Sequence, residues 1–159
     1  RLFVGHIGDI TGLVFHPNGA YLASIGGGGD RSVRLWDVRK GNCVRIFGGH
    51  LSSLTAVKIC PFGRTIAVGC DDGSVSLWNI ADGKKITSAN KHNDSIEALA
   101  FSPDGLVLVS GGFDCVVKVW DMEKISELLR EKFVSKLEGP LEEYRTKSTP
   151  IYSLCYAGK

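Results

Sequence analysis

A chain of 159 residues, of which 43% are apolar and 23% charged, has the size and composition of one ordinary globular domain. No apolar run reaches the length of about eighteen residues that a membrane-spanning helix needs, and the first residues lack the basic and apolar regions of a signal peptide. The sequence therefore supports neither membrane spanning nor secretion. The net charge is +2, and lysine and arginine are spread along the chain, so we also expect no direct contact with nucleic acid.

The first predicted unit contains four strands, near residues 10–15, 21–25, 32–36 and 43–47. Continuous apolar runs of this kind are typical of strands that are packed on both faces. The connection between the second and third of these strands holds the string GGGGD at Gly26–Asp30, for which a phosphate-binding loop is the alternative interpretation. That string lacks the Gly-Lys-Ser/Thr ending of such loops, so we favour a stretched turn.

The whole unit is repeated along the chain. Trp36, Trp78 and Trp120 are each 42 residues apart, within the period of about 40–45 residues that four-stranded repeat units have. A histidine 11 positions before a proline, and an aspartate 6 positions before the tryptophan, keep the same register in every unit. These residues are His6, Pro17, Asp30, His50, Pro61, Asp72, His92, Pro103 and Asp114. The register predicts three structural units of one kind.

The third unit follows the pattern and then departs from it. The strings SIEALAFSPDG, LVLVSGG and CVVKVWD predict its first three strands, and LEEYRTK predicts a delayed fourth strand. An insertion at about 122–138 separates the third strand from the fourth. We expect that this insertion lies at the edge of the unit opposite its histidine-bearing turn, because it interrupts that particular connection.

The insertion contains the string MEKISELLREKF, at Met122–Phe133, with apolar residues at helical spacing and charged residues between them. This spacing predicts an amphipathic helix in which Leu128 and Leu129 are buried and Glu127 and Lys132 face solvent. A docking helix for a partner is the alternative to a helix that lies against the rest of the unit. We favour the second interpretation.

The five cysteines do not form a pattern that binds metal. Their number is odd, and no pair has the Cys-x-x-Cys spacing that begins many zinc sites. We expect free thiols that act as small apolar groups in strands, as in a reducing compartment, and we expect no metal and no cofactor. The residues are Cys43, Cys60, Cys70, Cys115 and Cys155.

The ends of the three units carry paired residues that identify a family. The first unit has GH at residues 5–6 and WD at 36–37, the second has GH and WN, and the third has KH and WD. These pairs resemble the signatures of the WD-repeat family. The resemblance implies an all-β fold, a segment of a WD-repeat β-propeller with three four-stranded blades, partial flanking blades and one short helical insertion. The units would cover about 5–48, 49–90 and 91–146.

His6, Ser24 and Asp30 have the chemistry of a base, a nucleophile and an orienting acid, so a catalytic triad is one interpretation. The same three residue types recur in the third unit, and an enzyme does not need one triad twice. The WD-repeat resemblance instead implies a structural hydrogen-bond network inside each blade, and no catalytic residue. Val68 replaces the serine in the middle unit, so its network should be shorter. The expected members are His6, Ser24, Asp30, Trp36, His50, Asp72, Trp78, His92, Ser110, Asp114 and Trp120.

Both ends of the chain look like parts of neighbouring blades. RLFV at Arg1–Val4 resembles the last strand of an earlier blade, and PIYSLCY at Pro150–Tyr156 resembles the first strand of a later blade over 150–159. Propellers have about four to eight blades, so we expect a segment of a longer chain. On its own, such a segment would expose apolar strand faces.

Three strings indicate one branch of the WD-repeat family, namely FHPNGAYLAS, GNCVRIFGGH and YRTKSTPIYSL. They resemble the C-terminal propeller of the subunit 5 family of the general transcription factor TFIID. The resemblance implies a nuclear, non-enzymatic scaffold in RNA polymerase II transcription initiation, shared in some lineages with the SAGA coactivator complex. The implied partners are histone-fold-containing and helical-repeat subunits, with no nucleic acid, membrane or small molecule bound directly.

The repeats by themselves support an unrelated WD-repeat adaptor, in signalling or in ubiquitin ligation, equally well. In either case the connecting turns are the expected partner-binding surfaces, because turns on a rigid frame often carry function. The turns that we expect to bind partners contain Asp9, Ser52, Ser53, Asn93 and Asp94.

Overall fold

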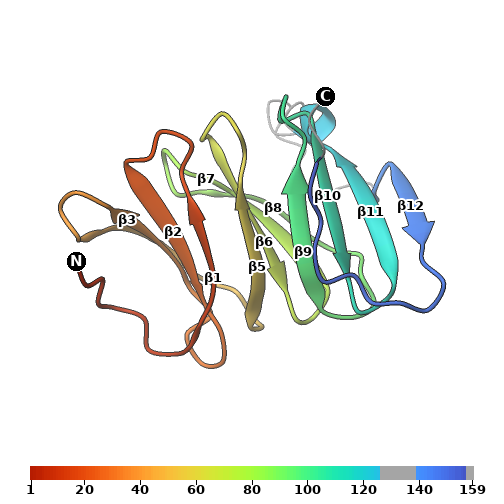
Figure 1. Cartoon of the computed structure of the whole chain (residues 1–159), viewed down its shortest axis with the longest axis horizontal. Helices are drawn as coiled ribbons and strands as arrows, with labels where there is room; N and C mark the ends of the chain where they lie inside the picture. The colour runs from red at the N-terminus through yellow and green to blue at the C-terminus, as the bar shows by residue number, and fades with distance from the viewer. Residues whose placement is uncertain (126–138, 157–159) are drawn as a thin grey trace.

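The computed structural model describes residues 1–125 and 139–156, and these form three antiparallel sheets of four strands each (Figure 1). The first sheet contains β1 (Ile10–Phe15), β2 (Tyr21–Gly26), β3 (Val33–Asp37) and β4 (Cys43–Phe47). The second sheet contains β5 (Leu54–Ile59), β6 (Thr65–Cys70), β7 (Ser74–Asn79) and β8 (Lys85–Asn90). The third sheet contains β9 (Ile96–Phe101), β10 (Val107–Gly112), β11 (Val116–Asp121) and β12 (Glu142–Arg145). The all-β fold class predicted from the sequence is confirmed.

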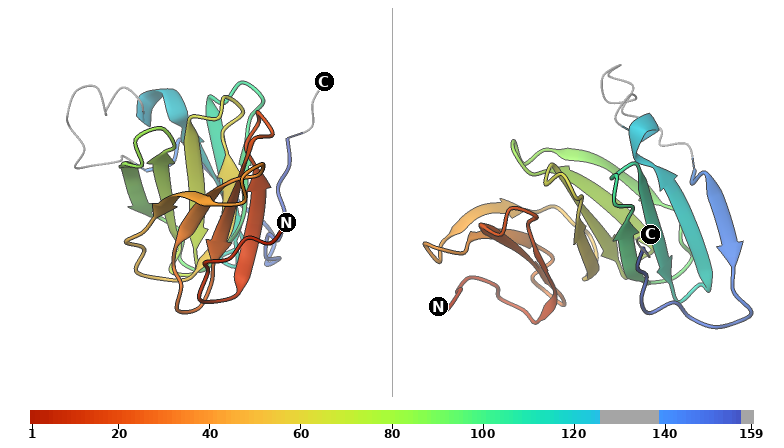
Figure 2. Two further views of the ribbon diagram at one scale, coloured as in Figure 1. Left: turned by 90° about the vertical axis from the view of Figure 1, so that its left-hand side faces the viewer. Right: turned by 45° about the horizontal axis from the view of Figure 1, so that its top comes forward.

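Strands pair in chain order within each sheet, and the sheets stand beside one another in chain order (Figure 2). The four strands predicted in the first unit are present, and only their ends differ: β2 extends to Gly26, and β3 covers Val33–Asp37. The delayed fourth strand of the third unit is β12, where Lys118 of β11 lies opposite Glu143. Strand positions therefore follow the apolar runs of the sequence.

The turn between the first two strands of each sheet depends on glycine. Gly105, between β9 and β10, has φ of +67°, and its equivalents Gly19 and Gly63 both have φ of +69°. A residue with a side chain rarely adopts this left-handed conformation, whereas glycine does so without steric cost. The repeated Pro-x-Gly strings therefore end each first strand at the same point.

Two apolar cores hold the sheets together. The core between the first and second sheets includes Phe47 and Ile66, and the core between the second and third includes Ile96 and Leu108. Each of these four side chains is at most 1% exposed. The second sheet is thus covered on both faces, which explains why its strands β5 and β6 are largely apolar.

The first sheet is covered on one face only. Val14 of β1 packs against the core shared with the second sheet. Its neighbours Leu13 and Phe15 point the other way, because side chains alternate along a strand, and both are about 60% exposed. Ile46 of β4 is also exposed. The first sheet therefore presents apolar side chains on its outer face, as the sequence predicted for an end of the segment.

A β-bulge at the start of the first strand links neighbouring sheets. The pairing register shifts at Thr11 in β1 and at Thr55 in β5, which turns these two side chains toward the next sheet. Thr11 Oγ1 donates a hydrogen bond of 2.7 Å to the carbonyl oxygen of Leu54. Thr55 Oγ1 donates in the same way to the carbonyl oxygen of Ile96. Each hydroxyl joins two sheets that share no backbone ladder.

The chain becomes helical at Met122–Ile125, directly after β11, and Ile125 is buried in the second core. The start of β9 and the end of β11 lie at opposite ends of the strands of the third sheet. This helical turn therefore lies at the end opposite the connection that precedes β9 (Figure 1). No helix in the part of the chain described here is long and apolar enough to cross a bilayer. The described residues do not include the expected positions Glu127, Leu128, Leu129, Lys132 and Phe133.

The strands expected at the two ends of the chain do not form in this structure. Neither Arg1–Val4 nor Pro150–Tyr156 is assigned to a strand, because no further strand lies beside either segment among the described residues. Ile151 nevertheless packs against Gly111. A Cβ added at Gly111 would lie 2.9 Å from Cγ2 of Ile151. The neighbouring blades, and the unit boundaries drawn from them, stay a prediction.

Replacing Thr55 with valine should lower the free energy of unfolding by about 1 kcal/mol, because the bond to the next sheet is lost while the side-chain shape is kept. Urea unfolding followed by circular dichroism measures the difference. The matched control is Thr87→Val in β8, a threonine whose hydroxyl makes no hydrogen bond among the described residues. Equal losses for both variants would contradict the role of Thr55 as a link between sheets.

Candidate functional site

In the first sheet, the predicted histidine, serine, aspartate and tryptophan lie together. Trp36 Nε1 donates to Ser24 Oγ over 2.7 Å, and Ser24 Oγ lies 2.6 Å from His6 Nε2. His6 Nδ1 lies 2.6 Å from Asp30 Oδ2, which also accepts the backbone N–H of Ile7. Since the serine oxygen accepts from the indole, its own hydrogen is free for the imidazole, whose other N–H then donates to the carboxylate. The result is a relay from strand β3 to the connection before β1.

The third sheet repeats this arrangement. Trp120 Nε1 donates to Ser110 Oγ over 2.9 Å, and Ser110 Oγ lies 2.7 Å from His92 Nε2. His92 Nδ1 lies 2.8 Å from Asp114 Oδ2, and the same oxygen accepts the backbone N–H of Asn93. The sequence register therefore brings the same four residue types together in two sheets.

The two serines are poorly placed for catalysis. Ser24 is 2% exposed and Ser110 is fully buried, and each hydroxyl oxygen already accepts an indole N–H. A nucleophile must reach its substrate, and the substrate would have to enter between packed strands. The hydrogen bonds between tryptophan, serine, histidine and aspartate instead attach the connection before the first strand to the sheet.

The electrostatics of these groups suit a structural bond. Burial alone would raise the pKa of Asp30, but hydrogen bonds from Ser32, from the backbone of Ile7 and from His6 outweigh it and lower the pKa to about 2. Burial lowers the pKa of His92, although the hydrogen bond that its imidazole donates to Asp114 acts in the opposite direction. Around neutral pH the carboxylate of Asp30 is therefore charged, and the imidazole of His92 is neutral.

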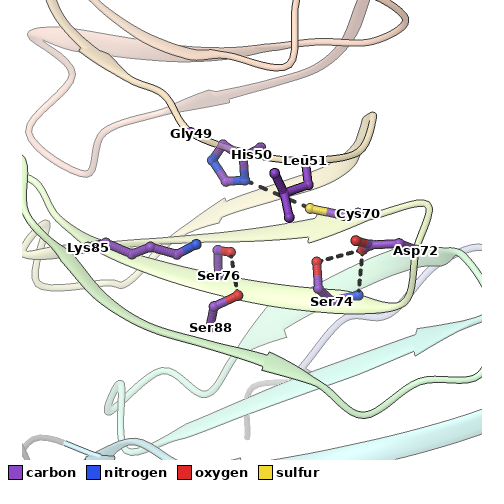
Figure 3. A pocket seen from close by; sticks show the side chains of 9 residues that line it. All are labelled: Gly49, His50, Leu51, Cys70, Asp72, Ser74, Ser76, Lys85 and Ser88. Carbon is purple, nitrogen blue, oxygen red and sulfur yellow. Dashed lines mark hydrogen bonds between the residues drawn. The ribbon is translucent and has the colours of Figure 1, made fainter. Parts of the chain in front are cut away.

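The second sheet does not build this network (Figure 3). Val68 replaces the serine, and neither His50 Nε2 nor Trp78 Nε1 has a hydrogen-bond partner among the described residues. Asp72 does not reach the histidine, because its Oδ1 accepts the backbone N–H and the hydroxyl of Ser74. The expectation that Asp72 belongs to the same network as His50 is therefore corrected: His50 Nε2 and Trp78 Nε1 have no partner among the described residues, and Asp72 is bonded to Ser74.

The side chain of Cys70 explains why Asp72 does not reach His50, and the sequence analysis did not predict this. Cys70 lies opposite the first residue of β5, and the equivalent residues of the other sheets are Gly26 and Gly112. A Cβ added at Gly26 would lie only 2.6 Å from Cγ of Asp30. A side chain at this position therefore occupies the space that the aspartate needs. The available signal was the cysteine in a register position that the other two units fill with glycine.

In place of the carboxylate, the sulfur of Cys70 lies 3.9 Å from His50 Nδ1. Burial lowers the pKa of His50 to about 4, and the charge of Lys85 adds to this effect. Burial also raises the pKa of the Cys70 thiol. Both groups are neutral near pH 7, so the pair lacks the thiolate and imidazolium charges of a catalytic cysteine.

The remaining candidate residues lie on connections at one edge of the sheets. Asp9 immediately precedes β1, Ser52 and Ser53 precede β5, and Asn93 and Asp94 precede β9. The side chains of Asp9, Asn93 and Asp94 are exposed, whereas the two serines are half-buried. The structure thus brings these residues to equivalent turns, and their role in binding a partner stays a prediction.

All five cysteines are free thiols. Within residues 1–125 and 139–156, no group of three or more histidine, cysteine or acidic side chains is arranged to hold a metal ion.

Comparison with known proteins gives one family over most of the chain. Residues 1–37, 41–79 and 83–121 match the family described as WD domain, G-beta repeat. Among solved structures, that titled "Structure of U3-55K" superposes with a TM-score of 0.84 at 22% identity, covering 98% of this chain and 45% of the other. At this identity the likeness concerns the fold alone.

Individual relatives match over shorter stretches. Transcription initiation factor TFIID subunit 5 of Caenorhabditis elegans is 50% identical over 66 residues, which is 42% of this chain and 10% of that protein. F-box and WD repeat domain containing protein 10B of Homo sapiens is 40% identical over 58 residues, 36% of this chain and 7% of that protein. The matched stretches are therefore small parts of these relatives.

Replacing Ser110 with alanine should lower the free energy of unfolding by about 1 kcal/mol or more, because the buried indole of Trp120 and imidazole of His92 both lose a partner. Urea unfolding gives the value. The control is Ser153→Ala, at an exposed position without a hydrogen bond among the described residues. A loss no larger than that of the control would show that the network does not contribute to stability.

Replacing Val68 with serine should leave the free energy of unfolding unchanged or raise it by about 1 kcal/mol, because the hydroxyl would supply His50 and Trp78 with a partner. Adding Cys70→Gly should raise stability beyond the single variant, since it clears the space that Asp72 needs. The same urea experiment compares the wild type with both variants. A large loss for Val68→Ser would indicate that this space tolerates apolar groups only.

The stability of the protein should fall as the pH is lowered from 6.5 to about 4, because His50 binds a proton in this range when unfolded but not when folded. A pKa unit corresponds to about 1.4 kcal/mol, so the loss at the acid end is about 3 kcal/mol. Unfolding measured at pH steps across this range should show a shallower slope for His50→Gln than for the wild type. An unchanged slope would mean that His50 is protonated in the folded protein.

Proposed function

Because this chain belongs to the WD40-repeat family, we propose that it works as a non-enzymatic protein–protein interaction scaffold, as a subunit of TFIID in RNA polymerase II transcription initiation. The observation that carries the TFIID assignment is the 50% identity with TFIID subunit 5 of Caenorhabditis elegans. The human F-box relative reaches 40% over a similar length. Over stretches of similar length, more positions are therefore identical with the transcription factor than with the F-box protein.

The stretch after β12 supports the same proposal. Thr146 Oγ1 donates to the carbonyl oxygen of Thr149 over 2.7 Å, and its backbone N–H donates to the carbonyl oxygen of Cys115. Ser148 between them has φ of +63°. The Thr-Lys-Ser-Thr-Pro string thus forms a defined turn that leads the chain from the outer strand of the third sheet back to β10. This string is the most specific part of the resemblance to the subunit 5 family.

The proposal includes nuclear localisation and, in lineages where one protein serves both complexes, membership of SAGA. Its partners would be the histone-fold-containing and helical-repeat subunits of these complexes. A frame of stacked sheets presents several turns at fixed positions, which suits simultaneous contacts in a large assembly. The chain would need no chemistry of its own for this role.

A second candidate function is that of an adaptor in ubiquitin ligation or signalling. The similarity to the human F-box and WD repeat protein favours the first of these, and 33% identity over 69 residues with a guanine nucleotide-binding protein subunit beta of rice favours the second. Both rest on repeat residues that the family shares.

Affinity purification of the tagged full-length protein from nuclear extract, followed by mass spectrometry, tests the proposal. We expect TFIID subunits, with SAGA subunits where one protein serves both, at levels far above those recovered with the tag alone. Recovery of ubiquitin-ligase or signalling proteins without transcription-factor subunits would overturn the TFIID assignment and leave the scaffold function in place.

A further inference from the structure

The second sheet has a cavity of about 320 Å³ at its outer side, between β7, β8 and the connection that precedes β5. Figure 3 shows Lys85, Ser76 and Ser88 together at one end of this cavity, with Asp72 and Ser74 at the other. We call it the second-sheet cavity. Its lining includes hydroxyl, ammonium and carboxylate groups, unlike the apolar space between the second and third sheets that Val75, Leu77 and Leu108 line.

One register position explains why the cavity exists in this sheet. The residue two places before each tryptophan is Arg34 in the first sheet, Ser76 in the second and Lys118 in the third. The guanidinium of Arg34 lies over the ring of Trp36, 6.0 Å from its centroid. Serine is too short to reach the corresponding place, and a cavity is present beside Ser76 instead.

A cation nevertheless occupies that place in the second sheet. Lys85 comes from the neighbouring strand β8, and its Nζ lies 5.5 Å from the centroid of Trp78. Figure 3 shows its side chain extending toward Ser76. All three sheets therefore keep one positive charge near this position, supplied in the second sheet by a different strand.

The third sheet shows what such a cation pairs with. Lys118 Nζ lies 2.7 Å from Glu143 Oε1, and these residues stand opposite each other on β11 and β12. The equivalent pair in the second sheet is Ser76 and Ser88, whose hydroxyl oxygens are 3.2 Å apart. No carboxylate among the described residues pairs with Lys85. The second sheet thus has the cation and two hydroxyls but lacks the acid.

We propose that the second-sheet cavity binds the side-chain carboxylate of an aspartate or glutamate supplied by a partner protein, in the position that Glu143 holds in the third sheet. Lys85 forms the ion pair. The hydroxyls of Ser76 and Ser88 are hydrogen-bonded to each other, so one of them donates to a carboxylate oxygen while the other donates to its neighbour. A basic side chain is disfavoured there, because it would meet the ammonium of Lys85. Asp72 does not oppose binding strongly, because it lies at the far end and already accepts two hydrogen bonds.

This inference rests on the proposed scaffold function, but not on which complex contains the protein. It assigns a chemical specificity to one surface: an acidic group on the partner that reaches into the second sheet. Contacts of this type contribute more to the choice and orientation of a partner than to affinity.

The test measures how fast a small amine-acylating reagent modifies Lys85 in the full-length protein, with Lys84 read in the same sample by mass spectrometry. The probe is glutamate blocked at both its backbone ends, and its isosteric control is blocked glutamine. We expect saturating blocked glutamate to slow acylation of Lys85 severalfold and to leave exposed Lys84 unchanged. Blocked glutamine should protect neither lysine.

Two variants complete the test. Ser88→Glu places an acid where the third sheet has Glu143, so Lys85 should be protected without any probe. Ser76→Arg should fill the cavity as Arg34 fills the equivalent space, so the probe should no longer protect Lys85. Unchanged circular dichroism and melting midpoints would show that each variant folds, and Ser88 is exposed, which makes its replacement tolerable.

Equal protection of Lys84 and Lys85, protection by blocked glutamine, or no saturable effect in the wild type would overturn the proposal. Stronger protection by inorganic phosphate than by blocked glutamate would also overturn it, because the cavity would then select phosphate. No partner protein is needed here, so a negative result leaves the outcome of the nuclear purification untouched.

Discussion

Two of the three sheets depend on one interaction, in which the buried indole N–H of the third-strand tryptophan finds an acceptor inside the protein. An orphaned buried donor costs about 1–3 kcal/mol. In the first and third sheets a serine hydroxyl accepts this N–H and bonds to a histidine, which an aspartate holds in turn. These bonds attach a connection outside the sheet to the strands within it. The positions of the exposed turns follow from that attachment.

The second sheet departs from this arrangement at three positions that act together. Val68 removes the acceptor, Cys70 displaces the aspartate, and the short side chain of Ser76 lines a cavity on the outer side of the sheet. This sheet lies between the other two and buries apolar side chains on both faces. Burial on two sides can offset the cost of polar atoms that lack a hydrogen bond, such as Trp78 Nε1. The sheet with the most apolar support therefore has the greatest freedom in its polar residues.

The residues that join the sheets are different from the exposed residues that can contact a partner. Apolar cores and the hydroxyls of Thr11 and Thr55 join neighbouring sheets and thereby hold the sheets next to one another. The connections before β5 and β9, and outer strands such as β8, carry exposed side chains, among them Leu51, Asp94 and Ser88. Lys85 lies on such an outer strand, so its charge can serve recognition without disturbing the core. A scaffold needs this combination of a fixed frame and variable edges.

The sequence by itself determined the repeat and the strand positions, because apolar runs, turn glycines and register are local properties that a 42-residue period makes visible. The resemblance to the WD-repeat family implied the residues of the two complete networks. Only the tertiary structure decided what happens in the second sheet. His50, Cys70 and Asp72 have the right residue types and spacing for a bonded set, yet the cysteine side chain fills the space of the carboxylate. The cavity beside Lys85 was equally hidden, since it results from side chains of three chain segments whose sizes matter only once folding brings them together.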